Sequence, residues 1–433
     1  MLKANLLTGR LAVLTKVSGN LFDQALAALS NVVLAIIVAR SVDAAAFGSF
    51  SIAYLVYGMA FAAMKAIIGQ PLQIRFSSAP PAELNRRMGE GAGATLSLSL
   101  LVTVACAVAG LLIGGTTGWA MLLLALWIPA LLVQDYCRMA FFAQGRPWSA
   151  ALIDTVWAVI QFAGLAVLIT TERTGLDWLM GAWGVGALVS AVVGLALLRV
   201  PPVVRATLSW LREQHDLARY LLAEYILGLG AAQVGILLVG VIAHESAVGA
   251  LRAAQVLLGP LGILGTAAFQ FAVPEIARRM PLTPRRLQIF AALVSGALVA
   301  AHLVYVMCLL LIPPAWGVQL FGDSWQGAAL VLLPMGLAAC FSCLANGPAG
   351  VLYGMGKAKQ TFRINLIKGP MIVVLLLGAT WLWGVLGSAW AFVAIEALIL
   401  PLWVITLVRV SRQPAEVVAD PTQSDLDPEV PRG

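Results

Sequence analysis

Charged residues are scarce in this sequence. Only 11% of its 433 residues are Asp, Glu, Lys or Arg, whereas 61% are hydrophobic, and this balance excludes an ordinary soluble globular protein. Lipid offers the backbone no hydrogen-bond partners, so an apolar run of about 20 residues crosses a membrane as a helix. Runs of that length recur between positions 18 and 408. They predict an all-α polytopic membrane protein with about twelve transmembrane helices.

Groups that support catalysis or metal binding are also rare. The five cysteines fall in predicted helices, which argues against a disulfide framework. Cys340 and Cys343 have C-x-x-C spacing, but no second Cys pair or His follows at a spacing typical of metal sites. The sequence has no Walker motif, and its outer loops are too short for the catalytic groups of a membrane glycosyltransferase, polymerase or ligase. We therefore expect no enzyme activity, no metal and no cofactor.

Lys and Arg gather on one side of the predicted membrane. If the N-terminus is cytoplasmic, the loops on that side hold most of the 27 basic residues, as the positive-inside rule requires. The first residues lack a small-residue cleavage site, so the first predicted helix is itself the insertion signal. The net charge of +7 then reports topology rather than nucleic-acid binding. We expect a multi-pass protein of the bacterial cytoplasmic (inner) membrane, surrounded by membrane lipids, with both termini in the cytoplasm.

The two halves of the sequence resemble each other. A shift of 201 positions places Gly48 on Gly249. A shift of 211 places the Gly-Arg pair at Gly145 on the Gly-Lys pair at Gly356. Two six-helix lobes in parallel repeat around a central cavity follow, and such repeats are typical of transporters that rock one half against the other. The predicted parts are an N-terminal lobe at 1–198, a cytoplasmic linker at 199–219, a C-terminal lobe at 220–410 and a disordered cytoplasmic tail at 411–433.

Four stretches carry a resemblance to a known family. They are "FGSFSIAY" (47–54), "QPLQIRF" (70–76), "QDYCRMAFFAQGRPWSAALIDTVW" (134–157) and "VGALRAAQVLLGPLGIL" (248–264). Together they resemble the lipopolysaccharide O-antigen and polysaccharide flippases of the multidrug/oligosaccharidyl-lipid/polysaccharide exporter superfamily. The resemblance implies a two-lobed bundle of helices around a V-shaped central cavity that works by alternating access.

The same resemblance implies a cargo. That cargo is a polyprenyl-pyrophosphate-linked oligosaccharide, moved from the inner to the outer leaflet for surface polysaccharide and lipopolysaccharide biosynthesis. Polysaccharide polymerases or glycosyltransferases are then expected as partners, besides the lipid-linked glycan itself. The alternative is a cation-coupled multidrug or metabolite antiporter of the same fold, in which the acids of the first, seventh and twelfth predicted helices would couple transport to an ion.

Acids lie just inside the cytoplasmic ends of the first and seventh predicted helices, at Asp23 and Glu224. Ionisable side chains within spans are costly, so by default they mark function. One hypothesis is that both acids belong to a ring of opposite charges that closes the cytoplasmic mouth. The other is that they are interfacial and balance the basic loops. Four further residues are assigned with them to gating or ion coupling: Asp135, Arg138, Asp154 and Asn365.

Arg252 lies near the outer end of the eighth predicted helix, on the side that otherwise avoids basic residues. A guanidinium can bind phosphate oxygens through two hydrogen bonds at once, and the implied cargo carries a pyrophosphate. Gln255 lies one turn on, and Lys65 is a second cation within a predicted helix. We predict that these three residues bind the substrate. The alternative is that Arg252 reaches the outer headgroups or pairs with Glu245, and that Lys65 reaches the inner headgroups.

Glu396 is the deepest carboxylate in the predicted helices, and His302 lies at a similar depth. Pro401 cannot donate a hydrogen bond to the carbonyl of Ala397, so the last predicted helix should kink beside Glu396. A carboxylate kept from water there suits a site that binds and releases a proton. We therefore assign Glu396 and His302 to ion coupling. The other interpretation is that Glu396 is permanently protonated and hydrogen-bonded to a neighbour.

Overall fold

The computed structural model describes residues 26, 29–279 and 282–412. Every element in this part of the chain is a helix, and it contains no strand, as the hydropathy predicted. Nine of its helices are long and apolar enough to cross a membrane, and a shorter apolar helix covers Leu29–Ser41. Asp23 and residues 413–433 of the predicted tail lie outside the described residues.

The helices form two bundles, joined by a short connecting region. The N-terminal bundle consists of α2 (Ala44–Met64), the π-helix η1 (Lys65–Gly69), α3 (Gln70–Phe76), α4 (Pro81–Ile113), α5 (Gly115–Ala143), α6 (Pro147–Thr170) and α7 (Leu176–Leu198). The connection consists of η2 (Val204–Ala206), α8 (Thr207–Tyr225) and the π-helix η3 (Ile226–Gly230). The C-terminal bundle consists of α9 (Ala231–Arg279), α10 (Pro284–Leu310), α11 (Pro314–Phe321), α12 (Ser324–Gly354) and α13 (Ala358–Ser411).

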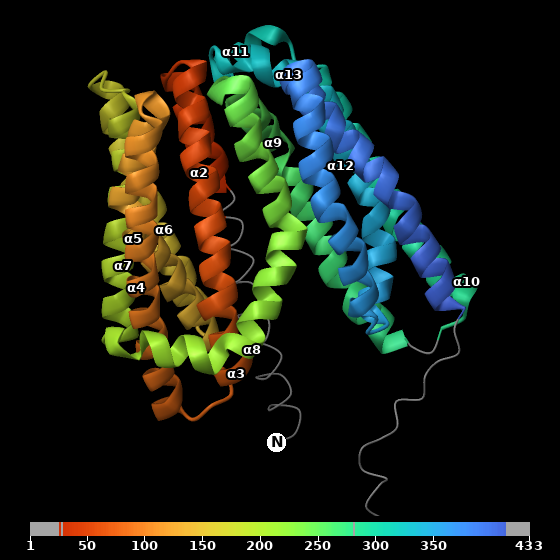
Figure 1. Ribbon diagram of the computed structural model, residues 1–433, viewed down its shortest axis with the longest axis horizontal. Coiled ribbons are helices and arrows are strands. Elements are labelled where there is room, and N and C mark those ends of the chain that lie inside the picture. The colour runs from red at the N-terminus through yellow and green to blue at the C-terminus, as the bar shows by residue number, and fades with distance from the viewer. Residues whose placement is uncertain (1–25, 27–28, 280–281, 413–433) are drawn as a thin grey trace, which may run out of the picture.

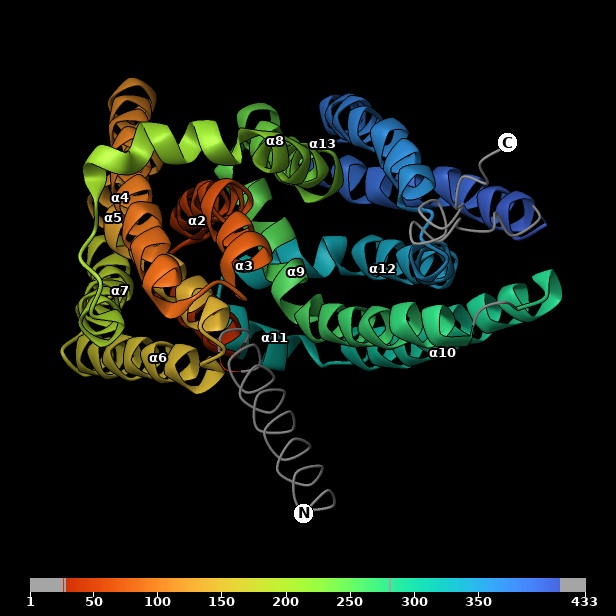
Figure 2. The ribbon, with the colours of Figure 1, turned by 90° about the horizontal axis from the view of Figure 1, so that it is seen from below.

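The two bundles meet at one end of the molecule and diverge at the other (Figure 1). We call these the α11 end, where α11 lies, and the α8 end, which α8 crosses. Seen from the α8 end, α4 to α7 stand apart from α10, α12 and α13, with α2 and α9 between them (Figure 2). Apolar packing joins the bundles, since Phe50 of α2 and Val256 of α9 belong to one buried cluster. The arrangement is the two-lobed one that the sequence predicted.

Two of the long helices each contain two membrane crossings. α13 has 54 residues, which at 1.5 Å per residue is about 80 Å, more than twice the roughly 30 Å apolar core of a bilayer. Non-helical backbone interrupts α9 at Ala243 and His244 and interrupts α13 at Trp383 and Gly384. Each of these helices therefore turns back at its interruption. With the Leu29–Ser41 helix added, the structure accounts for the twelve predicted spans.

Two turns share one backbone geometry. Gly145 has φ 68° and Gly356 has φ 72°, a left-handed conformation that glycine adopts without steric cost at the end of a helix. In both turns the residue after the glycine donates its N–H to the carbonyl four residues before the glycine, at 2.9 Å. The two glycines are the ones that the shift of 211 positions aligned. The repeat detected in the sequence is therefore present in the backbone of these turns.

α8 is an amphipathic helix held against the N-terminal bundle. Its Trp210 is buried, and the indole N–H donates to a backbone carbonyl of η1. Arg75 of α3 pairs with Asp216, and this hydrogen bond lowers the pKa of the Asp216 carboxyl. Arg87 of α4 pairs with Glu213 at 2.6 Å. Most of the segment predicted as a linker is therefore a helix that two arginines and a tryptophan attach to one bundle.

The turn between the two parts of α9 places a histidine in a glycine-like conformation. His244 has φ 65° and ψ 165°, a region that is almost exclusive to glycine and costs other residues about 1–3 kcal/mol. In the turn between the two parts of α13, a glycine, Gly384, has the positive φ of 60°. We expect His244→Gly to raise the melting temperature of the purified protein, whereas His244→Ala, which keeps the strain, should not. A His244→Gly variant that melts below the wild type would contradict this assignment of strain.

The backbones of the two bundles approach closely at a pair of glycines. A Cβ added to Gly48 on α2 would overlap the carbonyl oxygen of Glu245 on α9. A Cβ added to Gly249 would lie 3.1 Å from the backbone nitrogen of Gly48. Small residues at helix contacts allow backbones to come this near. The shift of 201 positions that aligned the two glycines therefore relates residues that touch each other across the bundle interface.

Candidate functional site

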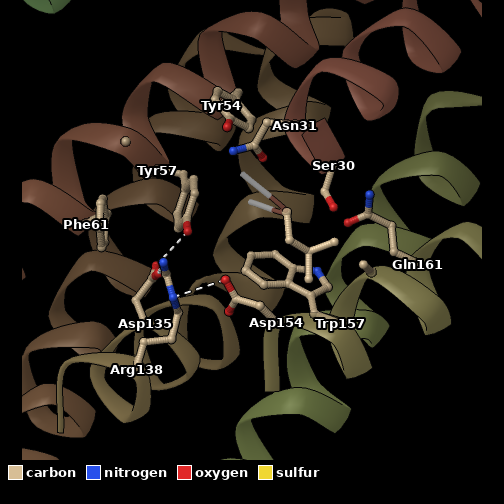
Figure 3. Close-up of a pocket in the computed structure, with 13 residues that line it drawn as sticks. Ser30, Asn31, Tyr54, Tyr57, Phe61, Asp135, Arg138, Asp154, Trp157 and Gln161 are labelled. Carbon is tan, nitrogen blue, oxygen red and sulfur yellow. Dashed lines mark hydrogen bonds and ion pairs between the residues drawn. The ribbon is translucent and has the colours of Figure 1, made fainter. Parts of the chain in front are cut away.

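A pocket lies among α2, α5 and α6 of the N-terminal bundle (Figure 3). Its volume is about 160 Å³, far above the roughly 10–15 Å³ that one water needs. α2 contributes Tyr54, Tyr57 and Phe61, whose spacing of three and four residues places them on one face of the helix. α6 contributes Asp154 and Trp157, which are three residues apart and therefore also share one face of their helix. The periodicity of single helices therefore brings aromatic and acidic side chains to one cavity.

Asp135, Arg138 and Asp154 form an ion network on one side of this pocket. Arg138 Nη1 lies 3.5 Å from Asp135 Oδ1, and Arg138 Nε lies 3.1 Å from Asp154 Oδ2. The Tyr57 hydroxyl donates to Asp135 at 2.6 Å, and the Gln134 amide donates to Asp154 at 2.7 Å. All three ionic side chains are at most 14% exposed. Partly dry pairs of this kind attract each other more strongly than surface pairs, and separating one leaves a costly buried charge.

Arg252 reaches across from the C-terminal bundle to this pocket. Its guanidinium carbon lies 4.2 Å from the centre of the Tyr54 ring, which belongs to the pocket wall. The Nε atom of Arg252 is buried, and it has no hydrogen-bond partner among the described residues. No ion pair with Glu245, the alternative raised above, is found in the described part of the chain. A guanidinium stacked on a ring keeps its N–H edge available, so Arg252 can donate to a ligand beside Tyr54.

A second ionic site lies in the C-terminal bundle. Lys368 Nζ donates to Glu396 Oε1 at 2.7 Å, and the two side chains are 21% and 14% exposed. The other oxygen, Glu396 Oε2, is buried without a hydrogen-bond partner in residues 29–279 and 282–412. α13 remains helical through Pro401, and its interruption lies at Trp383 and Gly384 instead of beside Glu396. The partner of Glu396 is therefore Lys368, which lies in the other half of α13, before the interruption.

His302 is buried on α10 and faces α12. Its Nδ1 lies 2.8 Å from the carbonyl of Leu298, and its Nε2 lies 3.1 Å from Cys343 Sγ. It also lines a separate cavity with Asn346. Among the described residues, no group of three or more His, Cys, Asp or Glu side chains could hold a metal ion. The histidine is therefore fixed by a backbone carbonyl and a thiol.

The remaining predicted site residues do not join one cluster. Lys65 is exposed in η1 and shares a small pocket with Asp135. Glu224 is exposed on α8, and Gln255 and Asn365 are half-buried on α9 and α13. Within the described ranges, Glu224 has no ion pair with another candidate. The proposed ring of charges around Asp23 and Glu224 therefore stays a prediction.

Sequence reasoning missed the neutral residues of the pocket, four of which matter most for its chemistry. Tyr54, Tyr57, Trp157 and Gln161 are neutral, and a search for ionisable groups inside predicted spans passes over them. A signal was nevertheless present, because Asp154, Trp157 and Gln161 recur at intervals of three and four residues and so share one face of α6. Polar and aromatic residues on a common stripe of an apolar helix indicate a face that does not contact lipid.

The fold of this chain is found in several solved transporters. A lipid II flippase, MurJ, in an inward-closed conformation matches with a TM-score of 0.71 at 9% identity, over 91% of this chain and 87% of that one. An inward-facing multidrug resistance MATE family transporter of the MOP superfamily matches with 0.66 at 14% identity, over 88% and 94%. A MOP superfamily transporter from Pyrococcus furiosus, described by a reverse polarity of its binding pocket, matches with 0.62 at 12% identity, over 93% and 94%.

These matches concern structure alone. No family model matches the chain, and no curated protein matches it in sequence. The chain has the fold of these solved transporters, and the part of it that the structure describes has nine helices long and apolar enough to cross a membrane. Its structural neighbours are flippases and transporters rather than enzymes. The neighbours include a lipid flippase and multidrug transporters, so the fold does not choose between the two kinds of cargo.

Proposed function

We propose that this protein moves a polyprenyl-pyrophosphate-linked oligosaccharide from the inner to the outer leaflet of the bacterial cytoplasmic membrane. The observation that carries the proposal is Arg252. It is a cation within a membrane-spanning helix, beside a cavity, with a buried N–H that lacks a partner among the described residues. Arg252 is partly buried, and a cation within a membrane span is costly unless a counter-charge is near; a pyrophosphate supplies one. Bidentate hydrogen bonding to phosphate is the chemistry for which arginine is suited.

The charge balance of the pocket supports an anionic cargo over a cationic drug. The carboxylates of Asp135 and Asp154 share one cation, Arg138. Lys65 and Arg252 add two further cations at the edges of the same region. A cationic drug would therefore meet a site in which positive groups outnumber negative ones. A lipid pyrophosphate would meet complementary charge.

The proposal includes a topology and an energy source. The α8 end, where Arg75, Arg87 and the Gly145 turn with its arginine lie, would face the cytoplasm with both termini. The pair of Lys368 and Glu396 would couple transport to a proton, which would bind Glu396 and release Lys368 from it. Asp23 and Glu224 would act in the gate, and polymerases or glycosyltransferases would receive or supply the cargo. The lobe boundaries 1–198 and 220–410 would be the two rocking units.

The experiment that tests the function is a gene deletion followed by measurement of lipid-linked glycan in each leaflet. Deletion should cause pyrophosphate-linked glycan to build up on the cytoplasmic leaflet and surface polysaccharide to fall, both restored by the wild-type gene. Arg252→Ala should fail to restore them, and Arg252→Lys should restore them only in part, because an ammonium lacks the planar pair of donors. The matched control is Arg173→Ala, since Arg173 also stacks on a ring, Trp178 at 5.3 Å, but is exposed.

A different result would favour the antiporter. Unchanged lipid-linked glycan together with new sensitivity to cationic drugs would contradict the flippase. Full restoration by Arg252→Ala, with the glycan phenotype present in the deletion, would contradict the role given to Arg252.

A further inference from the structure

The pocket of the N-terminal bundle combines aromatic rings with amide and carboxylate groups, and Arg252 contacts Tyr54 of its wall. We propose that this pocket is a sugar-binding subsite that holds the first ring of the glycan, the one joined to the pyrophosphate. The ligand class is a neutral hexose or 2-acetamido-hexose. This inference rests on the proposed function and adds to it the residues that would recognise the sugar.

The aromatic wall of the pocket is rigid. On α2, Tyr54 and Tyr57 pack edge to face with ring centres 5.9 Å apart, and Tyr57 stacks with Phe61 at 6.3 Å. On α6, the indole N–H of Trp157 donates to a backbone carbonyl of α7 at 3.2 Å, which fixes the orientation of that ring. Aromatic faces carry partial negative charge, and they attract the polarised C–H groups on the apolar face of a sugar. Because the rings are already fixed in place, binding the apolar face of a sugar costs little side-chain entropy.

The polar wall includes an amide nitrogen that has no hydrogen-bond partner in the described part of the chain. Gln161 is 3% exposed, lines the pocket, and its Nε2 atom has no hydrogen-bond partner among the described residues (Figure 3). A buried donor left unpaired is expensive, and native structures almost always satisfy such groups with protein, water or ligand. The pocket is roomy enough for the partner to be a molecule larger than water. Gln161 therefore marks a position where a ligand acceptor, such as a hydroxyl or acetamido oxygen, would lie.

The charges around the pocket favour a neutral hydroxylated ligand there over an ion. Asp135 and Asp154 share Arg138, and each also accepts one hydrogen bond from a neutral side chain. Arg138 and the Arg252 beside Tyr54 together balance these two negative charges, and the carboxylate oxygens can accept hydrogen bonds from hydroxyls. Asn31 and Ser30 add further polar groups on the opposite wall (Figure 3). Donors and acceptors in one cavity with an aromatic wall match a sugar ring, which presents both polar edges and an apolar face.

The position of Arg252 decides which sugar of the glycan would occupy the pocket. The guanidinium lies 4.2 Å from the centre of the Tyr54 ring, and Tyr54 forms part of the pocket wall. A phosphate bound by Arg252 would therefore be adjacent to whatever the pocket holds. In the proposed cargo only the first sugar is bonded to the pyrophosphate. One bundle would thus supply the phosphate contact and the other the sugar contact.

The test compares two short, water-soluble ligands on the full-length protein in lipid nanodiscs. The first is citronellyl pyrophosphate, and the second is citronellyl-pyrophosphate-linked N-acetylglucosamine. The second should bind about tenfold more tightly, because it gains the pocket contacts. Trp157→Leu and Gln161→Leu should each remove most of that gain while leaving the affinity for citronellyl pyrophosphate within about twofold. Arg252→Ala should weaken both ligands.

The controls separate the subsite from the function. Trp119→Leu, which removes an exposed tryptophan of α5, should leave both affinities unchanged. Melting curves of the two pocket variants show whether they remain folded. Equal affinity for the two ligands in the wild type would overturn the sugar subsite and leave the proposed function standing. Failure of both ligands to bind would overturn the proposed function and the subsite with it.

Discussion

Gly48→Ala is expected to force the two bundles apart at the α11 end. The new methyl group would overlap the carbonyl oxygen of Glu245, and a backbone atom cannot rotate away as a side chain can. Overpacking of this kind costs about 1–3 kcal/mol, which corresponds to about a 5- to 150-fold shift between two conformations. The population should move from the arrangement in Figure 1 toward one that is open at the α11 end. Transport should fall because the cycle needs both arrangements.

A cysteine placed at Ser30 reports the shift. Ser30 lines the pocket, so a membrane-impermeant maleimide added from the α11 side should label it faster in the Gly48→Ala protein. The background should carry Cys308→Ser, because Cys308 is the exposed cysteine of the described residues. The matched control is Gly296→Ala on α10, where a Cβ meets nothing within 4 Å. Equal labelling rates in the wild type, Gly48→Ala and Gly296→Ala would show that the glycine contact does not control opening of the protein at the α11 end.

The contact between Gly48 and Gly249 also shows where the axis that relates the two halves of the chain lies. Residues related by an internal repeat touch each other only where the axis that relates the two halves passes between them. A milder effect is expected for Gly249→Ala, because its Cβ would lie 3.1–3.2 Å from atoms of Gly48 and Phe47. When the two lobes rock against each other, the α11 end opens or closes at this contact. The glycine pair is therefore where a small change in packing should bias the whole transport cycle.

Arg138→Met is expected to destabilise the protein strongly. The change leaves Asp135 and Asp154, which are 7% and 6% exposed, without the cation they share. Removing one partner from a buried ionic group costs about 3–5 kcal/mol, because the charges left behind stay out of water. The melting temperature of the purified protein should fall clearly, as measured by thermal unfolding in detergent. Arg146→Met serves as the control, since Arg146 is exposed.

A compensating substitution distinguishes charge from shape. If unpaired carboxylates cause the loss, Asp135→Asn and Asp154→Asn introduced together with Arg138→Met should recover much of the stability. Tyr57 and Gln134 could still hydrogen-bond to the new amides, which have both donors and acceptors. A triple variant no more stable than Arg138→Met would mean that the arginine acts through its packing rather than its charge.

Much of the fold could be predicted from local patterns. Hydropathy predicted the helices because each segment that crosses the lipid must satisfy its backbone hydrogen bonds within itself. The Gly145 and Gly356 turns were predicted as equivalent because only glycine enters the left-handed region at no cost, and both have the positive φ. The sequence did not reveal that α8 begins at Thr207 and lies against the N-terminal bundle, because its amphipathic pattern does not say which surface it covers.

The candidate site was predicted only in part. Asp135 and Arg138 are neighbours on one helical turn, and their pairing follows from spacing alone. The contacts that complete the site join residues far apart in the chain: Tyr57 reaches Asp135 across 78 positions, and Lys368 reaches Glu396 across 28. The positive charge of Arg252 and its position near the outer end of a predicted helix singled it out in the sequence. Its place over Tyr54, however, depends on how the two bundles meet.

The sequence alone predicted a helical membrane protein with repeated halves and placed rare charges such as Arg252 and Glu396 within its spans, although it also placed Glu224 in one. Only the tertiary structure decided which of those charges share a cavity, because hydropathy measures the transfer of a whole segment into lipid and is blind to the rotation of a helix about its axis. That rotation is set by packing against neighbouring helices. In this chain it turns Tyr54 and Trp157 toward Asp154 and Arg252, and leaves Glu224 exposed on α8.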